Sequence, residues 1–112
     1  MITIWHNPRC SKSRQTLALI EAKGAVRIRK YLEDSPSAEE LRAVLKLLGI
    51  PAIDLMRKGE EAFKTSDLTA DSPEDALIAA MVATPKLIER PVVLANGQAR
   101  LGRPPEAVLD IL

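Results

Sequence analysis

The first 29 residues, MITIWHNPRCSKSRQTLALIEAKGAVRIR, carry the pattern on which the fold prediction rests. Residues 1–5 predict a short strand, with Ile2 and Ile4 on one face. After a turn, a helix is expected from about residue 10 to residue 23, and Gly24 is a typical helix stop. In residues 26–29 two apolar residues alternate with two arginines, which predicts a second strand with one solvated face. Strand, helix and strand over this length indicate a βαβ unit.

The middle of the chain predicts helices with clear boundaries. Ser37 and Glu40 form a capping box, and an apolar stripe with helical spacing follows until Gly49. The stripe consists of Leu41, Val44, Leu45 and Leu48. A shorter helix is expected from Pro51 to about residue 58, and Ser72-Pro73 predicts the cap and start of a helix that runs to about residue 82.

The last quarter of the chain predicts a hairpin and a final helix. Residues 91–95 and 98–101 are typical of strands, and Asn96-Gly97 between them is a strong hairpin signal. Pro104-Pro105 is expected to open a helix that ends at Leu112. The order βαβ, helices, ββα is that of an α/β domain of thioredoxin-like, or glutaredoxin-like, architecture. Such a domain has a four-stranded mixed sheet, here with an inserted helical segment.

Composition limits the classes of protein that fit. The chain has 112 residues, 46% apolar and 28% charged, which is typical of one globular domain. It has no apolar run long enough to span a membrane and no signal peptide pattern. A net charge of +1 and three aromatic residues argue against a nucleic-acid partner. The single cysteine excludes an internal disulfide and favours a reducing, cytoplasmic location.

Residues 6–14, HNPRCSKSR, form the segment most suited to chemistry. Cys10 lies where the loop becomes a helix, so unpaired N–H groups and the positive end of the helix dipole are expected near its sulfur. The segment contributes three cations, and no acidic residue occurs before Glu21. These cations are Arg9, Lys12 and Arg14. All of this favours a nucleophilic thiolate beside an oxyanion site, and His6 could add positive charge or hydrogen-bond to the sulfur.

Each of these residues also has a structural interpretation. A lone cysteine is often a small buried hydrophobe, but a polar, basic loop that starts a helix favours a reactive one. Arg57 is expected near the end of a short helix, whereas Arg90 and Arg103 each precede a proline, which holds the backbone extended. Arginine's planar fork suits a tetrahedral oxyanion. Sequence spacing alone does not bring the three arginines together, and each could be a surface charge.

Several motifs resemble one known family. Residues 5–11, WHNPRCS, with Ser13-Arg14 and Thr16-Leu17, are similar to the active-site motif of the glutaredoxin-linked arsenate reductases, the ArsC family. The likeness continues, in order, along essentially the whole chain, through residues 31–33, 55–58, 85–93 and 101–106. It implies that residues 1–112 form a single ArsC-like domain of thioredoxin-like fold, with a cis peptide bond before Pro91.

The resemblance also implies a reaction and a set of site residues. Arsenate would be reduced to arsenite, in arsenical resistance, through an adduct between the Cys10 thiolate and arsenic, with His6 helping to keep the sulfur ionised. The implied substrate-binding residues are Ser11, Arg57, Arg90 and Arg103. Glutathione would be the co-substrate and glutaredoxin the protein partner, with no bound cofactor or metal. One cysteine cannot supply both thiols of such a reduction, so an outside thiol is required.

Two alternatives remain open at this point. A related branch, the Spx-type regulators that bind RNA polymerase, shares the fold and carries a Cys-x-x-Cys switch. Here Ser13 occupies the second position, so a switch within the chain is impossible. A thiol oxidoreductase of the family without arsenate activity is the other alternative. The cysteine and the three arginines favour catalysis over a role in interaction alone.

Overall fold

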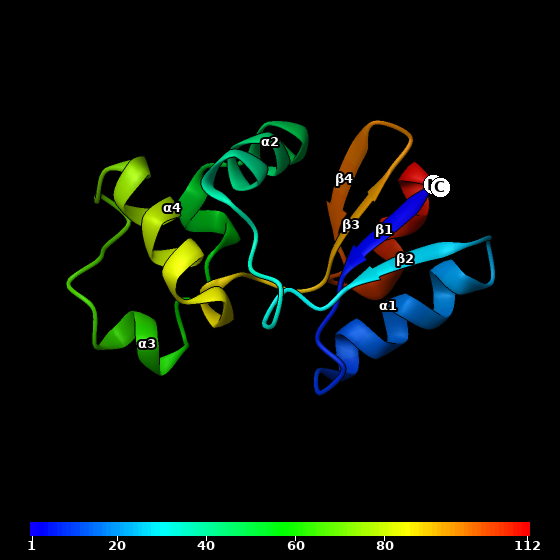
Figure 1. Cartoon of the computed structure of the whole chain (residues 1–112), viewed down its shortest axis with the longest axis horizontal. Helices are drawn as coiled ribbons and strands as arrows, with labels where there is room; N and C mark the ends of the chain where they lie inside the picture. The colour runs from blue at the N-terminus through cyan, green and yellow to red at the C-terminus, as the bar shows by residue number, and fades with distance from the viewer. The chain divides into compact units, whose positions relative to one another are not determined.

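The computed structural model describes residues 1–112, and the chain divides into two compact units. Residues 1–34 and 90–112 form the first, here called the sheet unit, because it contains all four strands. Residues 35–89 form the second, the helical unit, whose named elements are all helices (Figure 1).

The sheet unit is a four-stranded mixed sheet, as the sequence predicts. Its strands are β1 (Ile2–Trp5), β2 (Val26–Arg29), β3 (Val92–Ala95) and β4 (Gln98–Leu101). The strand order is β2-β1-β3-β4. β1 pairs in parallel with β2 and antiparallel with β3, and β3 pairs antiparallel with β4. In the turn between β3 and β4, Asn96 and Gly97 have φ of 53° and 73°, which is the geometry expected of a tight hairpin turn.

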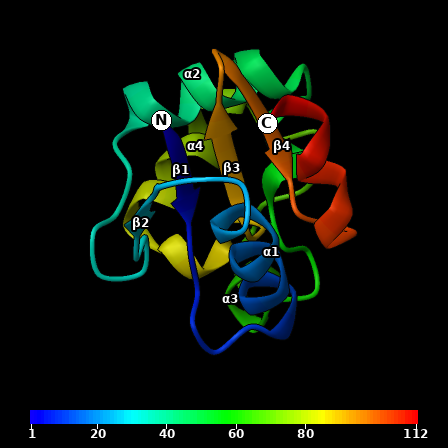
Figure 2. The same ribbon diagram turned by 90° about the vertical axis from the view of Figure 1, so that its right-hand side faces the viewer.

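Two helices pack on the sheet and against each other. The crossover helix α1 (Ser11–Glu21) and the C-terminal 3₁₀ helix η3 (Pro105–Ile111) lie side by side (Figure 2). Their inner faces close a core over β1 and β3, formed by Ile4, Ile20, Val93, Ala95, Val108 and Ile111. α1 ends at Glu21, before the predicted stop at Gly24. The last helix is 3₁₀ rather than α and begins directly after Pro104.

The predicted solvated face of β2 is confirmed for Arg27, which is exposed, but not for Arg29. Ile28 is 45% exposed, whereas Arg29 lies over the ring of Trp5, 5.6 Å from its centroid, and forms an ion pair with Asp34 at 3.3 Å. Ile28 is in register with the buried Ile4 on the neighbouring strand. Because β2 is an edge strand, the core face there is only partly covered, and alternation alone could not show this.

The helical unit confirms the strongest cap signals. It consists of α2 (Ala38–Leu48), η1 (Ala52–Leu55), α3 (Glu61–Lys64), α4 (Glu74–Ala83) and η2 (Pro85–Leu87). The Glu40 backbone N–H donates to Ser37 Oγ at 3.1 Å, and the Ser37 N–H donates to Glu40 Oε1 at 3.0 Å, which completes the capping box. Gly49 ends α2 with a left-handed backbone, φ 69°. α2 packs against α4.

None of the helices in the structure combines the length and the hydrophobicity that a membrane span requires.

Two expectations for the helical unit need correction, and two of its short helices were not predicted. The helix predicted for residues 51–58 is only η1, because Met56 forms an antiparallel bridge with Ile88 and is extended. Ser72 does not cap α4; its Oγ accepts from the Thr69 N–H at 2.9 Å, and Pro73 is the N-cap. α3 and η2 were not expected, since each has only one short turn.

A close backbone contact joins three segments of the sheet unit at Gly102. Its N–H donates to Pro91 O at 2.9 Å. A Cβ atom at this position would lie 2.5 Å from Thr16 Oγ1 and 2.6 Å from Pro91 Cγ, so no side chain fits. The peptide bond before Pro91 is cis, as the family resemblance implies, and the one before Pro104 is cis as well.

We expect Gly102→Ala to destabilise the protein by about 1–3 kcal/mol, because the added methyl group must displace Pro91 or Thr16. The matched control is Gly59→Ala, where a Cβ would meet nothing within 4 Å. That change is expected to stay within about 0.5 kcal/mol of wild type. Urea unfolding measures both variants, and equal stabilities would contradict the close approach.

Candidate active site around Cys10

Cys10 is the N-cap residue of α1. Its backbone is extended, with φ −96° and ψ 123°, its C=O accepts from the Arg14 N–H at 3.0 Å, and its own N–H donates to Asn7 O at 3.0 Å. The side chain is 8% exposed. The first N–H groups of a helix lack partners within it, and the helix dipole places partial positive charge at the same end. The structure therefore places Cys10 at the start of the helix, where the sequence predicts it.

The loop before Cys10 is braced by its own polar groups. The Arg9 N–H donates to Asn7 Oδ1 at 3.0 Å, which closes an Asx turn. Arg14 Nη1 donates to Pro8 O at 3.0 Å, so the first helical turn holds the loop that leads into it. These contacts set the path of the backbone on the N-terminal side of the sulfur.

His6 is buried behind this loop, and its contact is with a serine. Nδ1 lies 2.7 Å from Ser13 Oγ, which also accepts from the Asn7 N–H at 3.0 Å. Burial is the largest cause that lowers the pKa of His6 below 6.5, followed by the positive charges of Lys30 and Arg14. The ring is therefore predominantly neutral at pH 7, and its influence on the loop is that of a hydrogen-bonding group rather than a cation.

Ser13 and Thr16 are site-lining residues whose contacts sequence reasoning did not anticipate. Both are fully buried, and Thr16 Oγ1 donates to Lys12 O at 2.8 Å. They follow Cys10 at intervals of three on the inner face of α1. Their spacing in the sequence was the signal that could have identified them, because it places both on one face of the helix. Polar side chains on a buried face need hydrogen-bond partners.

The structure brings Arg103 beside the sulfur and into contact with the backbone of Arg90. Arg103 Nη2 lies 4.0 Å from Cys10 Sγ, and its Nε donates to Arg90 O at 2.8 Å. Arg90 precedes β3 and Arg103 follows β4, so both lie at the open end of the β3–β4 hairpin. Ser11 is the first residue of α1 and is exposed, next to the sulfur along the chain. Arg103 thus contacts Cys10, Arg90 contacts Arg103, and Ser11 adjoins Cys10 along the chain. His6 contacts Ser13 rather than the sulfur.

Arg57 belongs to the helical unit and has its own well-defined surroundings. Its backbone N–H donates to Leu87 O at 2.7 Å, which extends the bridge between Met56 and Ile88. Its Nη1 forms an ion pair with Glu60 Oε2 at 2.9 Å and donates to Lys86 O at 3.4 Å. Both side-chain contacts use Nη1, so the Nε–Nη2 edge of the guanidinium remains for another acceptor. The sequence did not indicate Glu60 as its partner.

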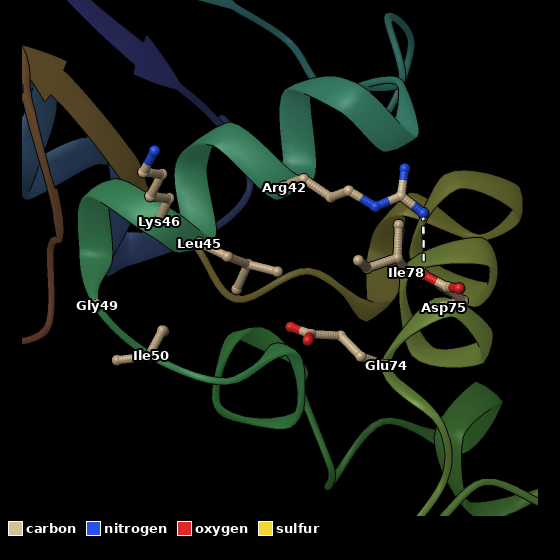
Figure 3. A pocket seen from close by; sticks show the side chains of 8 residues that line it. All are labelled: Arg42, Leu45, Lys46, Gly49, Ile50, Glu74, Asp75 and Ile78. Atoms are coloured by element: carbon tan, nitrogen blue, oxygen red, sulfur yellow. Dashed lines mark hydrogen bonds and ion pairs between the residues drawn. The ribbon is translucent and has the colours of Figure 1, made fainter.

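A cavity of about 400 Å³ lies between α2 and α4 of the helical unit (Figure 3). Its lining consists of Arg42, Leu45, Lys46, Gly49, Ile50, Glu74, Asp75 and Ile78. Arg42 Nη2 forms an ion pair with Asp75 Oδ1 at 3.1 Å. The Glu74 side chain points toward Leu45 and Ile50 (Figure 3). An unpaired carboxylate repels oxyanions, and none of the predicted site residues lines this cavity.

The Cys10 site combines a thiol with groups that can bind negative charge. The sulfur can attack an electrophilic centre, while Arg103 and the first N–H groups of α1 offer donors to oxygens bound to that centre. The chain holds no group of three or more His, Cys, Asp or Glu side chains that could bind a metal ion. This arrangement is suited to nucleophilic attack on an oxyanion.

Comparisons with known proteins show what this chain is similar to. A model of the ArsC family matches residues 5–111. YfgD, an uncharacterized protein of Escherichia coli K12, is 52% identical over 99% of this chain and 96% of that protein. An arsenate reductase of Neisseria meningitidis serogroup B is 44% identical over 99% of this chain and 97% of that protein. The solved structure of an arsenate reductase from Vibrio cholerae is 54% identical, with a TM-score of 0.95, over 99% of this chain and 97% of that one. The last likeness confirms the predicted thioredoxin-like fold.

We expect the ring of His6 to titrate with a midpoint below 6.5, because burial and two nearby cations disfavour its protonation. His6 is the only histidine, so its ring-proton NMR signals report this directly. A lowered pKa means that the unfolded chain binds the proton more readily, so the stability contributed by His6 is present above pH 6.5 and lost as the pH falls below it. The urea-unfolded chain is the control, and a native midpoint at or above its value contradicts the buried, neutral ring.

Proposed function

The chain belongs to the ArsC family, and on that premise we propose that it reduces arsenate to arsenite with Cys10 as the nucleophile. The observation that supports this most directly is the contact between Arg103 Nη2 and Cys10 Sγ at the start of α1, which pairs a nucleophile with an oxyanion donor. Relatives at 44% and 54% identity that span nearly the same length bear the name arsenate reductase.

In the first step the Cys10 thiolate attacks arsenic. A sulfur–arsenic bond forms, and one arsenate oxygen leaves as hydroxide or, once protonated, as water. Ser11 and the neighbouring N–H groups of the first turn would bind the remaining oxygens. His6 would act on the sulfur through the loop that its contact with Ser13 braces.

The reduction needs two electrons and therefore two thiols. Because the chain has one cysteine, the second thiol comes from outside, and we assign this role to glutathione with glutaredoxin as the partner. Glutathione attacks the arsenic atom of the adduct, and a second oxygen leaves as water. The glutaredoxin thiolate then attacks the glutathione sulfur, which breaks the sulfur–arsenic bond, leaves its electron pair on arsenic and forms a glutathione–glutaredoxin disulfide. Water finally cleaves the bond between Cys10 and the reduced arsenic, which releases arsenite and regenerates the Cys10 thiol. Arsenate and two thiols thus yield arsenite, one disulfide and one water. This chemistry suits a reducing cytoplasm, with residues 1–112 acting as one catalytic domain.

Three arginines complete the proposed oxyanion site. Arg103 is supported by its contact with Cys10, Arg90 by the hydrogen bond from Arg103 to its carbonyl oxygen, and Arg57 by the family resemblance alone. A guanidinium offers two parallel N–H donors, which match two oxygens of a tetrahedral oxyanion. The product, arsenite, is neutral at pH 7, so the arginines favour the substrate over the product and aid its release.

The proposal is tested by arsenate-dependent oxidation of NADPH, coupled through glutathione reductase, glutathione and glutaredoxin. We expect turnover by the wild type and none by Cys10→Ser. Exchange of thiols without arsenate turnover would instead identify a thiol oxidoreductase. Absence of both activities in the folded protein would favour a regulator or interaction module.

Arg90→Lys and Arg103→Lys are each expected to lower kcat/KM for arsenate by roughly ten- to a hundredfold. Lysine keeps the charge but loses the bidentate fork, and one charged hydrogen bond is worth about 1.5–3 kcal/mol. Arg27→Lys, on the exposed edge strand β2, is the matched control and should retain wild-type kcat/KM. Wild-type kcat/KM in both site variants would mean that the oxyanion is bound elsewhere, and thermal unfolding checks that they are folded.

Arg57→Lys tests the third arginine separately, with Arg42→Lys as a control that also alters an ion-paired arginine of the helical unit. If Arg57 binds the oxyanion, KM for arsenate should rise by about tenfold in the first variant and stay unchanged in the second. An unchanged KM in Arg57→Lys would restrict the oxyanion site to the sheet unit.

A further inference from the structure

Charge is unevenly divided between the two units. The sheet unit carries ten Lys and Arg residues against five Asp and Glu, a net charge of +5. The helical unit carries six against ten, a net charge of −4. The net charge of +1 for the whole chain therefore conceals one basic unit, and Cys10 belongs to it.

Two cations beside Cys10 have no acidic partner. Arg9 directly precedes the cysteine and Lys12 follows it by two residues, and both side chains are exposed. Neither side chain forms a hydrogen bond or ion pair in the structure. By contrast, Arg29 and Arg42 are each held by an aspartate. The positive charge of Arg9 and Lys12 therefore acts on whatever approaches the sulfur from solution.

We propose that Arg9 and Lys12 select the second thiol of the reaction by charge and favour an anionic low-molecular-weight thiol. This inference rests on Cys10 acting as the nucleophile in the proposed function. A peptide thiol with two carboxylates and one ammonium group carries a net negative charge and is drawn toward the sulfur, whereas a cationic thiol is repelled. Both cations lie within one or two residues of the sulfur, and screening in solution extends over about 8–10 Å at moderate ionic strength.

The effect falls on the rate of approach rather than on a fixed contact. Exposed charges on flexible side chains change association rates and their dependence on salt, with little effect on the bound geometry. The rate of arsenate reduction would not isolate this effect, because the arginines of the proposed oxyanion site also attract arsenate. A series of thiol reagents that differ only in charge separates the two contributions.

Three disulfides of similar length provide the series: 3,3′-dithiodipropionate is anionic, 2-hydroxyethyl disulfide is neutral and cystamine is cationic. The Cys10 thiolate attacks one sulfur, the S–S bond of the reagent breaks, a bond to Cys10 forms, and the other half leaves as a thiolate. The return step is attack by that same charged thiol on the Cys10 mixed disulfide. Since Cys10 is the only cysteine, mass spectrometry of the protein follows each reaction at one site.

For each thiol we take the rate of its reaction with the anionic reagent divided by its rate with the cationic reagent. The normalised ratio is this quotient for Cys10 divided by the same quotient for 2-mercaptoethanol, a small neutral thiol. At low ionic strength we expect a normalised ratio of about ten. This normalised ratio should fall to about two in molar salt, where screening extends only about 3 Å. The ratio does not depend on the ionisation or the exposure of Cys10, because these affect all three reagents equally.

The double variant Arg9→Gln/Lys12→Gln should reduce the normalised ratio to about three or less at low ionic strength. The matched control is Lys23→Gln/Arg27→Gln, which removes the same charge from exposed positions of the sheet unit away from the Cys10 loop. It should retain a ratio of about ten.

A ratio near one in the wild type, or an equal loss in both double variants, would overturn the proposal. A Cys10 that reacts with none of the reagents would overturn it together with the proposed nucleophile. A charge preference that depends on Arg9 and Lys12, in a protein that does not reduce arsenate, would support this inference and reject only the proposed function.

Discussion

The approach of Gly102 to Thr16 and Pro91 is the contact on which the site depends most. It joins the inner face of α1 to both ends of the β3–β4 hairpin at a separation that admits no side chain. Cys10 lies six residues before Thr16, as the N-cap of that helix, and Arg103 directly follows Gly102. The position of the sulfur relative to the guanidinium is thus set by a backbone contact rather than by the two functional groups themselves.

The polar groups behind the sulfur serve a different purpose from the cations in front of it. His6, Ser13 and Asn7 satisfy one another inside the protein, and burial favours the neutral form of the imidazole. The charges of Arg9 and Lys12 remain in solvent. A buried cation behind the sulfur would cost desolvation energy, whereas exposed cations attract anions at little cost to folding. The loop therefore has one side that is buried and hydrogen-bonded, and another side that is exposed and positively charged.

Much of the scaffold was predictable because its signals are local. The capping box of Ser37 and Glu40, the left-handed Gly49 and the Asn96-Gly97 turn each act within a few residues, so their backbone geometry follows from their own chemistry. The failures have tertiary causes. Ile28 is exposed because β2 lies at the edge of the sheet, and the helix predicted after Pro51 stops early because Met56 pairs with Ile88.

For the candidate site, the sequence by itself determined the proposed nucleophile and its setting: a single cysteine at a helix start, with three cations and no acidic residue in its segment. The resemblance to the ArsC family added three arginines but no geometry. Only the tertiary structure decided that Arg103 meets Cys10, that the hydrogen bond of His6 goes to Ser13, and that Arg57 is paired with Glu60. Residues 10 and 103 are far apart along the chain, so their meeting depends on strand order and on the packing at Gly102. Helix ends and tight turns depend on neighbouring residues and can be inferred from sequence, whereas contacts across the fold exist only once the core has formed.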